Sequence, residues 1–237
     1  MRLLSHASAL GLLCAGLVAA ETPPEKPETQ AGEFRVLLGI APAYAVTEEA
    51  TPRGGGGTTT YEWEGTEENA RVLGLQYVRP FGKANVIGQP IFGLELQISN
   101  AELKPTSYTV DGSSFSNNLS ERITYVAFTP AAILGLRFAE PEDNELGLIG
   151  EVQAMVGLSL IGGYIESDLG TDGSLGYGVD GGVRILLGLK EAGWSGSVIA
   201  GVRGGYASIS FDQGNPTSDM TLESVGAEVL LAIGHEF

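Results

Sequence analysis

The sequence predicts an all-β fold, an eight-stranded antiparallel up-and-down transmembrane barrel with short periplasmic turns and longer extracellular loops. Three observations predict it. Apolar and polar residues alternate with a period of two through long segments, and long and short connections alternate between them. The charged residues within these segments lie on the parity opposite to the apolar ones, which is typical of strands that face lipid on one side.

Composition limits the functional classes. The 237-residue chain has 13 Lys and Arg against 29 Asp and Glu, a formal net charge of −16. This charge argues against a nucleic-acid partner, because phosphate backbones attract basic patches. The single cysteine excludes a disulfide scaffold and a zinc site built from a cysteine cluster.

The first 33 residues precede the predicted barrel. Arg2 is followed by an apolar run from Ala9 to Val18 and then by Ala19 and Ala20, the pattern of a secretory signal peptide over 1–20. This run is too short to span about 30 Å of hydrocarbon. Residues 21–33, rich in Pro and charge, are predicted to form a disordered periplasmic linker, and residues 34–237 the barrel. An exported chain of this kind is expected in the outer membrane of a Gram-negative-type cell.

Alternation predicts the strands. In Gly93–Ser99, Leu, Leu and Ile occupy one parity, and Gly, Glu, Gln and Ser occupy the other. The alternating segments are longer than the average soluble strand of about five or six residues, but they suit tilted strands that cross a membrane. They cover approximately 34–46, 68–80, 87–101, 121–138, 145–165, 174–190, 194–211 and 219–237.

The connections indicate the orientation. Those at 81–86, 139–144 and 191–193 are short, whereas those at 47–67, 102–120, 166–173 and 212–218 are mostly long and polar. With a periplasmic N-terminus, the longer loops are extracellular. Loops on a rigid scaffold are where recognition is expected.

The parity that carries the charges separates a membrane barrel from a soluble one, which has its apolar residues inside. Here one parity of the fourth segment carries Phe128, Leu134, Leu136 and Phe138, and the opposite parity of the chain carries charged residues next to Gly and Ser. A narrow interior filled with charges requires an outer face in lipid. Aromatic residues near strand ends are predicted to form interfacial girdles: Tyr44, Tyr77, Phe81, Phe138, Tyr164, Trp194 and Tyr206.

The inward parity predicts a charge network in the lumen. If the turn between the sixth and seventh segments is centred within 190–193, Asp180 faces Arg203. If the loop 212–218 is near-symmetric, Arg203 faces Glu228. The Arg203 guanidinium would then hydrogen-bond both carboxylates. The alternative is a one-residue bulge that directs Arg203 to trapped water. The predicted network comprises Glu95, Glu151, Asp180, Arg184, Arg203 and Glu228.

The last strand, Val229-Leu230-Leu231-Ala232-Ile233-Gly234-His235-Glu236-Phe237, alternates and ends in phenylalanine. With this strand and the eight segments, residues 34–237 resemble the OmpA/OmpX-like family of small eight-stranded outer-membrane barrels. The resemblance implies that Phe237 is an assembly signal read by the barrel-assembly machinery, although His235 and Ala232 replace an aromatic residue and a glycine that are common there. It implies an anchor, adhesin, envelope-stabilising protein or, rarely, an enzyme.

Enzymatic chemistry has little support. After the signal peptide His235 is the only histidine, and it lies at the periplasmic end on the lipid-facing parity, so no Ser-His-acid arrangement can form at the extracellular side. The segment 166–173 offers oxygen ligands but lacks the spacing and the closing Glu of an EF-hand. No catalytic, cofactor-binding or metal-binding residues are therefore predicted.

The predicted function is that of a non-enzymatic outer-membrane protein, acting in surface interaction, adhesion or envelope integrity through its extracellular loops. The expected partners are outer-membrane lipid, the barrel-assembly machinery during biogenesis and an extracellular ligand of the loops. A small channel is the alternative. A lipid-modifying enzyme of the outer membrane is a third hypothesis, disfavoured by the position of His235.

Overall fold

The computed structural model describes residues 31–51, 59–65, 69–84, 86–110, 113–116, 122–139, 145–167, 170–212 and 217–237. In these ranges no helix is long and apolar enough to cross a membrane. The strands are β1 (Glu33–Pro42), β2 (Ala45–Thr51), β3 (Thr59–Gly65), β4 (Asn69–Pro80), β5 (Gln89–Val110), β6 (Ser113–Ser116), β7 (Arg122–Ala139), β8 (Gly147–Ser167), β9 (Gly170–Glu191), β10 (Trp194–Asp212) and β11 (Thr217–Glu236).

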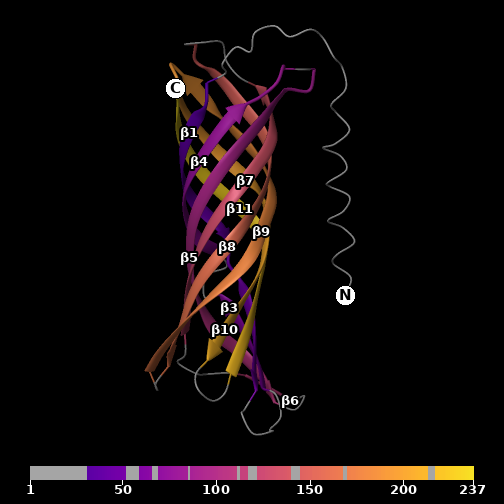
Figure 1. Cartoon of the computed structure of the whole chain (residues 1–237), viewed down its shortest axis with the longest axis vertical. Helices are drawn as coiled ribbons and strands as arrows, with labels where there is room; N and C mark the ends of the chain where they lie inside the picture. Colours follow the sequence, from indigo (N-terminus) through magenta and orange to yellow (C-terminus); the bar gives the residue numbers. More distant parts are fainter. Residues whose placement is uncertain are drawn as a thin grey trace. The chain divides into compact units, whose positions relative to one another are not determined.

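Eight of the described strands close into a ring, in the order β1-β4-β5-β7-β8-β9-β10-β11, and β11 pairs back to β1 (Figure 1). Every pairing is antiparallel, and the neighbours in the ring follow one another along the chain. The predicted eight-stranded antiparallel up-and-down barrel is therefore confirmed. Its architecture is the one that the resemblance to the OmpA/OmpX-like barrels implies.

The strands reach further than the sequence predicts. The segment 47–67 was expected to be a loop, but it contains most of β2 and all of β3, which pair with each other. β2 also pairs with β11, and β3 with the outer half of β5, so that these two strands replace β1 and β4 in the ring at this end. The segment 102–120 likewise holds the end of β5 and the short strand β6. Cross-strand pairing satisfies backbone groups that a loop would leave to solvent.

The stagger of the ring fixes the tilt of its strands. If cross-strand partners are followed from strand to strand around the ring, starting at Gly226 of β11, the path comes back to β11 at Glu236. Glu236 lies ten residues further along the same strand. A stagger of this kind around eight strands goes with a tilt of about 40° to the barrel axis. The path runs through Arg203, Gly182, Met155, Ile133, Gly93, Val78 and Glu33.

The two ends of the barrel differ. At one end, here named the turn end, β9 and β10 are joined by Ala192 and Gly193, and the chain ends at Phe237. Ala192 and Gly193 have positive φ angles of 48° and 81°, as a two-residue type I′ hairpin requires. The opposite end, here named the loop end, carries β2, β3 and β6 (Figure 1).

Polarity reverses along the barrel. Between the two ends most outward residues are apolar, and the inward residues combine the buried charged groups with apolar side chains such as Leu37, Leu186 and Ile199, whereas at the loop end an apolar cluster fills the interior. On β10 and β11 at this end, Ile209 and Leu222 are buried while Ser208 and Glu223 are exposed. That distribution is typical of a barrel wall in water. The cluster comprises Tyr44, Val46, Leu103, Ile123, Tyr125, Ala127, Ile161, Ala207, Ile209, Met220 and Leu222.

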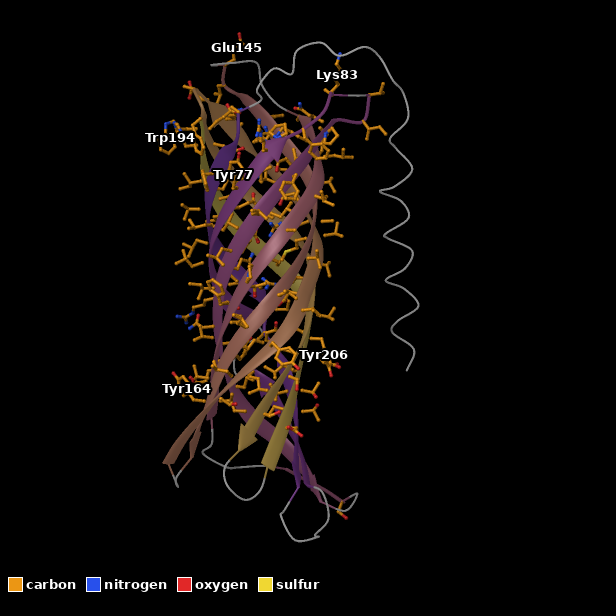
Figure 2. The ribbon with its side chains drawn as sticks, in the orientation of Figure 1. Tyr77, Lys83, Glu145, Tyr164, Trp194 and Tyr206 are labelled. Atoms are coloured by element: carbon orange, nitrogen blue, oxygen red, sulfur yellow. The ribbon has the colours of Figure 1, made fainter. Side chains whose placement is uncertain are left out.

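Exposed aromatic residues gather at two levels. Figure 2 places Tyr77 and Trp194 near the turn end and Tyr164 and Tyr206 towards the loop end. Phe81 and Phe138 are also exposed. Tyr44 is the exception among the predicted girdle residues, because its side chain is 5% exposed and lies inside the barrel. It follows β1 at the point where the chain bends between β1 and β2, so the alternation of a regular strand does not apply to it.

Candidate functional site: the charge network in the barrel interior

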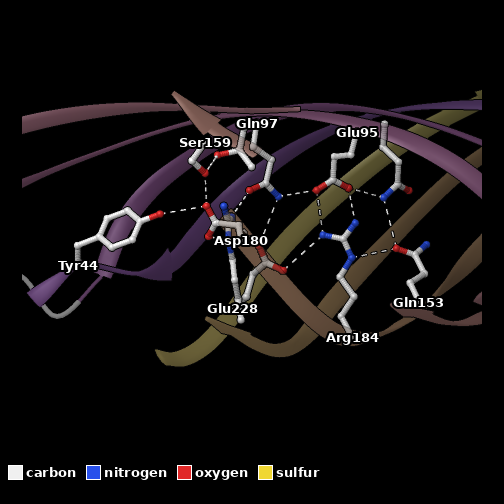
Figure 3. A network of polar contacts seen from close by, with 11 residues as sticks. Tyr44, Glu95, Gln97, Gln153, Ser159, Asp180, Arg184 and Glu228 are labelled. Atoms are coloured by element: carbon white, nitrogen blue, oxygen red, sulfur yellow. Dashed lines mark hydrogen bonds and ion pairs between the residues drawn. The ribbon is translucent and has the colours of Figure 1, made fainter. Parts of the chain in front are cut away.

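All six residues of the predicted lumen network lie on the inner face with buried side chains. Each is 5% exposed or less. They come from five strands of the ring, β5, β8, β9, β10 and β11, and their parity is the one that the alternation predicts. In Figure 3, Glu95, Asp180, Arg184 and Glu228 lie among glutamine, serine and tyrosine side chains.

Arg203 contacts both of the carboxylates proposed for it. Its Nε donates to Oδ1 of Asp180 at 3.1 Å, and its Nη1 lies 3.4 Å from Oε1 of Glu228. The same Nη1 donates to Oε1 of Gln97. The other carboxylate oxygen of Asp180 accepts hydrogen bonds from Tyr44 Oη, at 3.0 Å, and from the Ser159 hydroxyl. Every oxygen of Asp180 therefore has a donor.

The predicted register of these strands is wrong by two residues. Arg203 faces Gly182 on β9 and Gly226 on β11, not Asp180 and Glu228. The hairpin turn is centred on Ala192 and Gly193, one residue further along than assumed, and moving a turn by one residue moves the facing partner by two. A shift of two preserves the parity, so the side chains still meet diagonally inside the barrel. Both ladders run without a bulge past Arg203, which excludes the alternative register.

Arg184 forms a second centre beside the first. It is paired with Glu95 through Nη1, at 3.1 Å, and Nη2. Its Nη1 lies 3.4 Å from Oε2 of Glu228, and its Nε donates to Oε1 of Gln153 at 2.9 Å. Glu228 thus lies between Arg184 and Arg203 and joins their two groups of contacts.

A third centre near the turn end was only partly predicted. Glu151 accepts hydrogen bonds from Arg35 at 2.8 and 2.7 Å and from Nε of Arg137 at 2.8 Å. Glu33 lies 2.7 Å from Nη2 of Arg35 and 3.2 Å from Nη2 of Arg137. Ser195 donates to the other oxygen of Glu33. Two guanidinium groups are therefore enclosed by two carboxylates.

Three of these residues, Glu33, Arg35 and Arg137, were not among the lumen residues predicted from the sequence. Glu33 was assigned to the linker, but it is the first residue of β1 and is 1% exposed. Arg35 shares the inward parity of Leu37 in β1, and Arg137 shares that of Ile133 in β7, so alternation alone could have placed both in the lumen.

Two glutamines join the centres into one network. Gln76 accepts from Arg35 at 2.9 Å and donates to Glu95 at 2.6 Å. Gln153 donates to Glu151 at 2.6 Å and accepts from Arg184. The connected charged groups are the carboxylates of Glu33, Glu95, Glu151, Asp180 and Glu228 and the guanidinium groups of Arg35, Arg137, Arg184 and Arg203. Five negative and four positive charges nearly balance.

The polar groups of the network are almost all paired, and apolar side chains such as Leu37, Leu186 and Ile199 pack in the interior with them. Among the described buried side chains, the polar atoms without a hydrogen-bond partner are Nε of Arg35 and Oγ of Ser197. Charges removed from water are tolerated when they are paired and hydrogen-bonded in this way, and removing one partner is costly. The network is therefore suited to closing the barrel and to holding its wall together.

The described residues contain neither a cluster of metal ligands nor a histidine inside the barrel. No group of three or more His, Cys, Asp or Glu in them is arranged to hold a metal ion. His235 points outward at the turn end, where its ring lies 4.5 Å from that of Trp194. Phe237, two residues after His235, is 66% exposed, and its ring stacks on that of Phe34 at 5.2 Å.

Comparison with known proteins gives structural similarity without sequence similarity. No protein-family model matches the chain, and no curated protein does. A search of solved structures finds Ail, the attachment invasion locus protein of Yersinia pestis, at 10% identity and a TM-score of 0.35, covering 87% of this chain and 99% of that one. It also finds the outer membrane protease OmpT of Escherichia coli at 11% identity and a TM-score of 0.45, covering 92% of this chain and 100% of that one.

The outer membrane protein OprG of Pseudomonas aeruginosa is similar at 13% identity and a TM-score of 0.42, covering 88% of this chain and 97% of that one. Identities of this size concern the fold and not the activity. What the site does is argued below from this chain's own residues.

Proposed function

We propose that this protein is an outer-membrane barrel with a closed interior, a non-enzymatic anchor that presents its loop end for surface interaction or envelope integrity. One observation carries the proposal. Between the two aromatic levels of β8, β9 and β10 the outward side chains are uncharged, whereas the inner face of the barrel buries four arginines and five carboxylates. Lipid outside and paired charges inside account for both faces, and water outside accounts for neither.

Two layers of side chains favour a closed barrel over a small channel. The charge network joins strands on all sides of the ring, from β1 and β4 to β9 and β11. Beyond it, at the loop end, the apolar cluster around Tyr125 and Leu103 occupies the interior. An ion that crosses would have to break buried ion pairs and then leave water for an apolar layer, and both steps are unfavourable.

The loop end supports a role in surface interaction. There β2, β3, β6 and the outer part of β5 extend the barrel wall beyond the aromatic level of Tyr164 and Tyr206 (Figure 2). The exposed residues of β10 and β11 at this end are polar, so this part of the wall suits water. Recognition of a partner is commonly carried by segments that a rigid scaffold holds out in this way.

Export and insertion are part of the proposal. The predicted signal peptide, 1–20, and most of the predicted linker lie outside the described residues. A chain exported through this signal would reach the outer membrane with its turn end in the periplasm. The barrel-assembly machinery and outer-membrane lipid are then its partners. The position of His235 on the outer face at the turn end disfavours a lipid-modifying enzyme at the extracellular side.

Conductance of the purified protein in planar bilayers tests the closed barrel. We expect no steady single-channel current from the wild type, and current steps from a variant in which Arg203→Ala opens the network. A steady wild-type conductance would contradict the closed barrel and support the alternative function, a small channel. Hydrolytic or acyl-transfer activity on outer-membrane lipid would contradict the non-enzymatic anchor and support the third hypothesis.

Accessible tags on cells test the orientation. A tag at Ser114, in β6, is expected to be reachable on intact cells, and so is one at Gly55, which lies outside the described residues. A tag at Asp143, also outside them, is expected to be reachable only after permeabilisation. The reverse accessibility would overturn the orientation and move the proposed interaction surface to the periplasm.

A further inference from the structure

The apolar outer surface differs in height around the barrel. On β8 the outward residues from Leu148 to Tyr164 include no charged or amide side chain, and on β9 the same holds from Leu189 to Leu175. These runs contain sixteen and fourteen residue steps along their strands. Leu158, Leu175 and Tyr177 within them are 66%, 84% and 76% exposed.

On the opposite side of the ring the apolar surface is short. The outward residues of β5 are apolar from Pro90 to Ile98, eight residue steps along the strand, and Asn100 follows. On β4 only Tyr77, Leu75 and Leu73 lie between the two exposed arginines, Arg79 and Arg71. On β1 the exposed apolar residues end at Ile40. The outer surface of β1, β4 and β5 is here named the short face.

The difference is large on the scale of a membrane. A strand rises about 3.3 Å per residue, and a tilt of about 40° leaves about 2.5 Å of it along the barrel axis. The apolar surface is then about 40 Å high on β8 and about 35 Å on β9, against about 20 Å on β5 and about 20 Å between the arginines of β4. The hydrocarbon core of a bilayer is about 30 Å thick, between these extremes.

Tilting the whole barrel does not explain the difference. A tilt raises the apolar surface on one side and lowers it on the other, but it leaves the height of each side unchanged. The register supplies residues at one level for comparison. Asn100 pairs through Val126 and Gly162 with Leu175 on β9. Paired residues do not lie at one level, because the ring is staggered by ten residues over eight strands, about 1.25 residues per strand. Three pairings separate Asn100 from Leu175, so the residue of β9 at the level of Asn100 lies about four residues nearer the turn end, at Val179.

Two residues at the same level therefore have opposite character. Val179, 52% exposed, continues the apolar surface of β9, whereas Asn100 and its paired neighbour Arg71 are exposed polar residues on the short face. Polar and charged side chains such as these suit the headgroup region of a bilayer and not its acyl chains. Acyl chains suit Val179 at the same depth.

We infer that the short face thins the bilayer: lipid headgroups there descend to Arg71 and Asn100, at a depth where β9 still contacts acyl chains. The partner is the lipid next to β1, β4 and β5. The inference rests on the proposed membrane-spanning barrel and assigns to one side of it a different effect on the bilayer. A protein whose apolar surface is shorter than the hydrocarbon core draws the two leaflets together at that surface.

Spin labels at single cysteines test the depth. Because the only native cysteine, Cys14, lies in the predicted signal peptide, Asn100→Cys and Val179→Cys each place one label on the mature chain. In dioleoyl-phosphatidylcholine vesicles with phosphatidylglycerol, we expect a water-soluble nickel chelate to relax the label at 100 at least about threefold more than the label at 179. Molecular oxygen, which partitions into acyl chains, is expected to give the opposite order.

Variants that lengthen the short face test the cause. Arg71→Leu with Asn100→Leu adds apolar surface where the face ends, and is expected to move the preferred bilayer from lauroyl towards oleoyl chains. The ratio of folding yield in oleoyl to that in lauroyl vesicles should rise at least about threefold. Ser208→Leu is the matched control, because it adds leucine to the outer surface of β10 beyond Tyr206, where the apolar surface is already long. It should leave the ratio unchanged.

The outcomes separate this inference from the proposed function. If the chelate reaches both labels as freely as it does in the unfolded chain, the barrel does not span the membrane and the proposed function fails. If both labels are equally protected, the barrel spans but the short face does not thin the bilayer, and the inference alone fails. An unchanged yield ratio for the folded double variant would also overturn the inference.

Discussion

Arg203 and Asp180 form an ion pair between β10 and β9 although they are two residues out of register. Arg203 faces Gly182, and Asp180 faces Gly205, yet Nε of Arg203 lies 3.1 Å from Oδ1 of Asp180. The glycines leave room beside each partner, so the long arginine side chain reaches its diagonal neighbour. A pair of this kind depends on the residues that face it as much as on its own two members.

Removing the arginine tests the importance of this pair. Arg203→Ala leaves Asp180 and Glu228 buried with fewer cationic partners, and we expect the free energy of unfolding to fall by about 3–5 kcal/mol. Denaturant titration of the folded protein in detergent micelles measures it. Lys83→Ala, at an exposed position of the turn after β4, is the control and should change stability by less than about 0.5 kcal/mol. Equal stability of the two variants would contradict the pairing.

Gly205 tests the space around Asp180. A Cβ atom at this position would lie 2.6 Å from Oδ1 of Asp180 and 2.9 Å from Oη of Tyr44. We therefore expect Gly205→Ala to cost about 1–3 kcal/mol of unfolding free energy, because the polar contacts of Asp180 must shift. On the same strand, Gly196 has no atom within 4 Å of its would-be Cβ, so Gly196→Ala should not destabilise the protein. Loss of stability in the second variant and not in the first would refute the argument.

Ala192 is strained in the β9–β10 turn. Its φ of 48° suits asparagine or glycine, and Gly193 after it, at 81°, completes the type I′ turn. Ala192→Asn is expected to raise the free energy of unfolding by about 1 kcal/mol, measured by denaturant titration. Ala192→Val, which puts a β-branched residue at the same φ, should lower it. If valine were as stable as asparagine there, the turn would not be strained.

The predicted role of Phe237 in assembly can be tested separately from its packing. Deleting it removes both the stack on Phe34, at 5.2 Å, and the C-terminal residue that the family resemblance implies to be an assembly signal. Phe34→Ala removes the stack, together with the ring contact of Phe34 with Tyr77 at 5.0 Å, and keeps Phe237 in place. With purified barrel-assembly machinery in vesicles, we expect the heat-modifiable, folded fraction to fall several-fold more for the deletion than for Phe34→Ala. Similar fractions in both variants would mean that Phe237 matters only as a packed ring.

The face of a strand on which each side chain lies could be predicted from the sequence, because it is a local property of the chain. A strand turns successive side chains to opposite faces, so the alternation of Leu94, Glu95, Leu96 and Gln97 is enough to place Glu95 inside whatever the other strands do. The same reasoning predicts the lumen residues, and together with the alternating lengths of the connections it predicts the fold class and the end at which Trp194 and His235 lie. It fails at Tyr44, where the strand is interrupted and the alternation with it.

Only the tertiary structure decides which side chains contact each other and at which level along the barrel axis each residue lies. Which carboxylate contacts Arg203 depends on where each turn is centred, and a shift of one residue there changes the facing residue from Asp180 to Gly182. The network between β1 and β8 that joins Arg35 to Glu151, and the common level of Asn100 and Val179, depend on the stagger of the closed ring. Stagger is a property of all eight strands together, so no single segment of the sequence contains it.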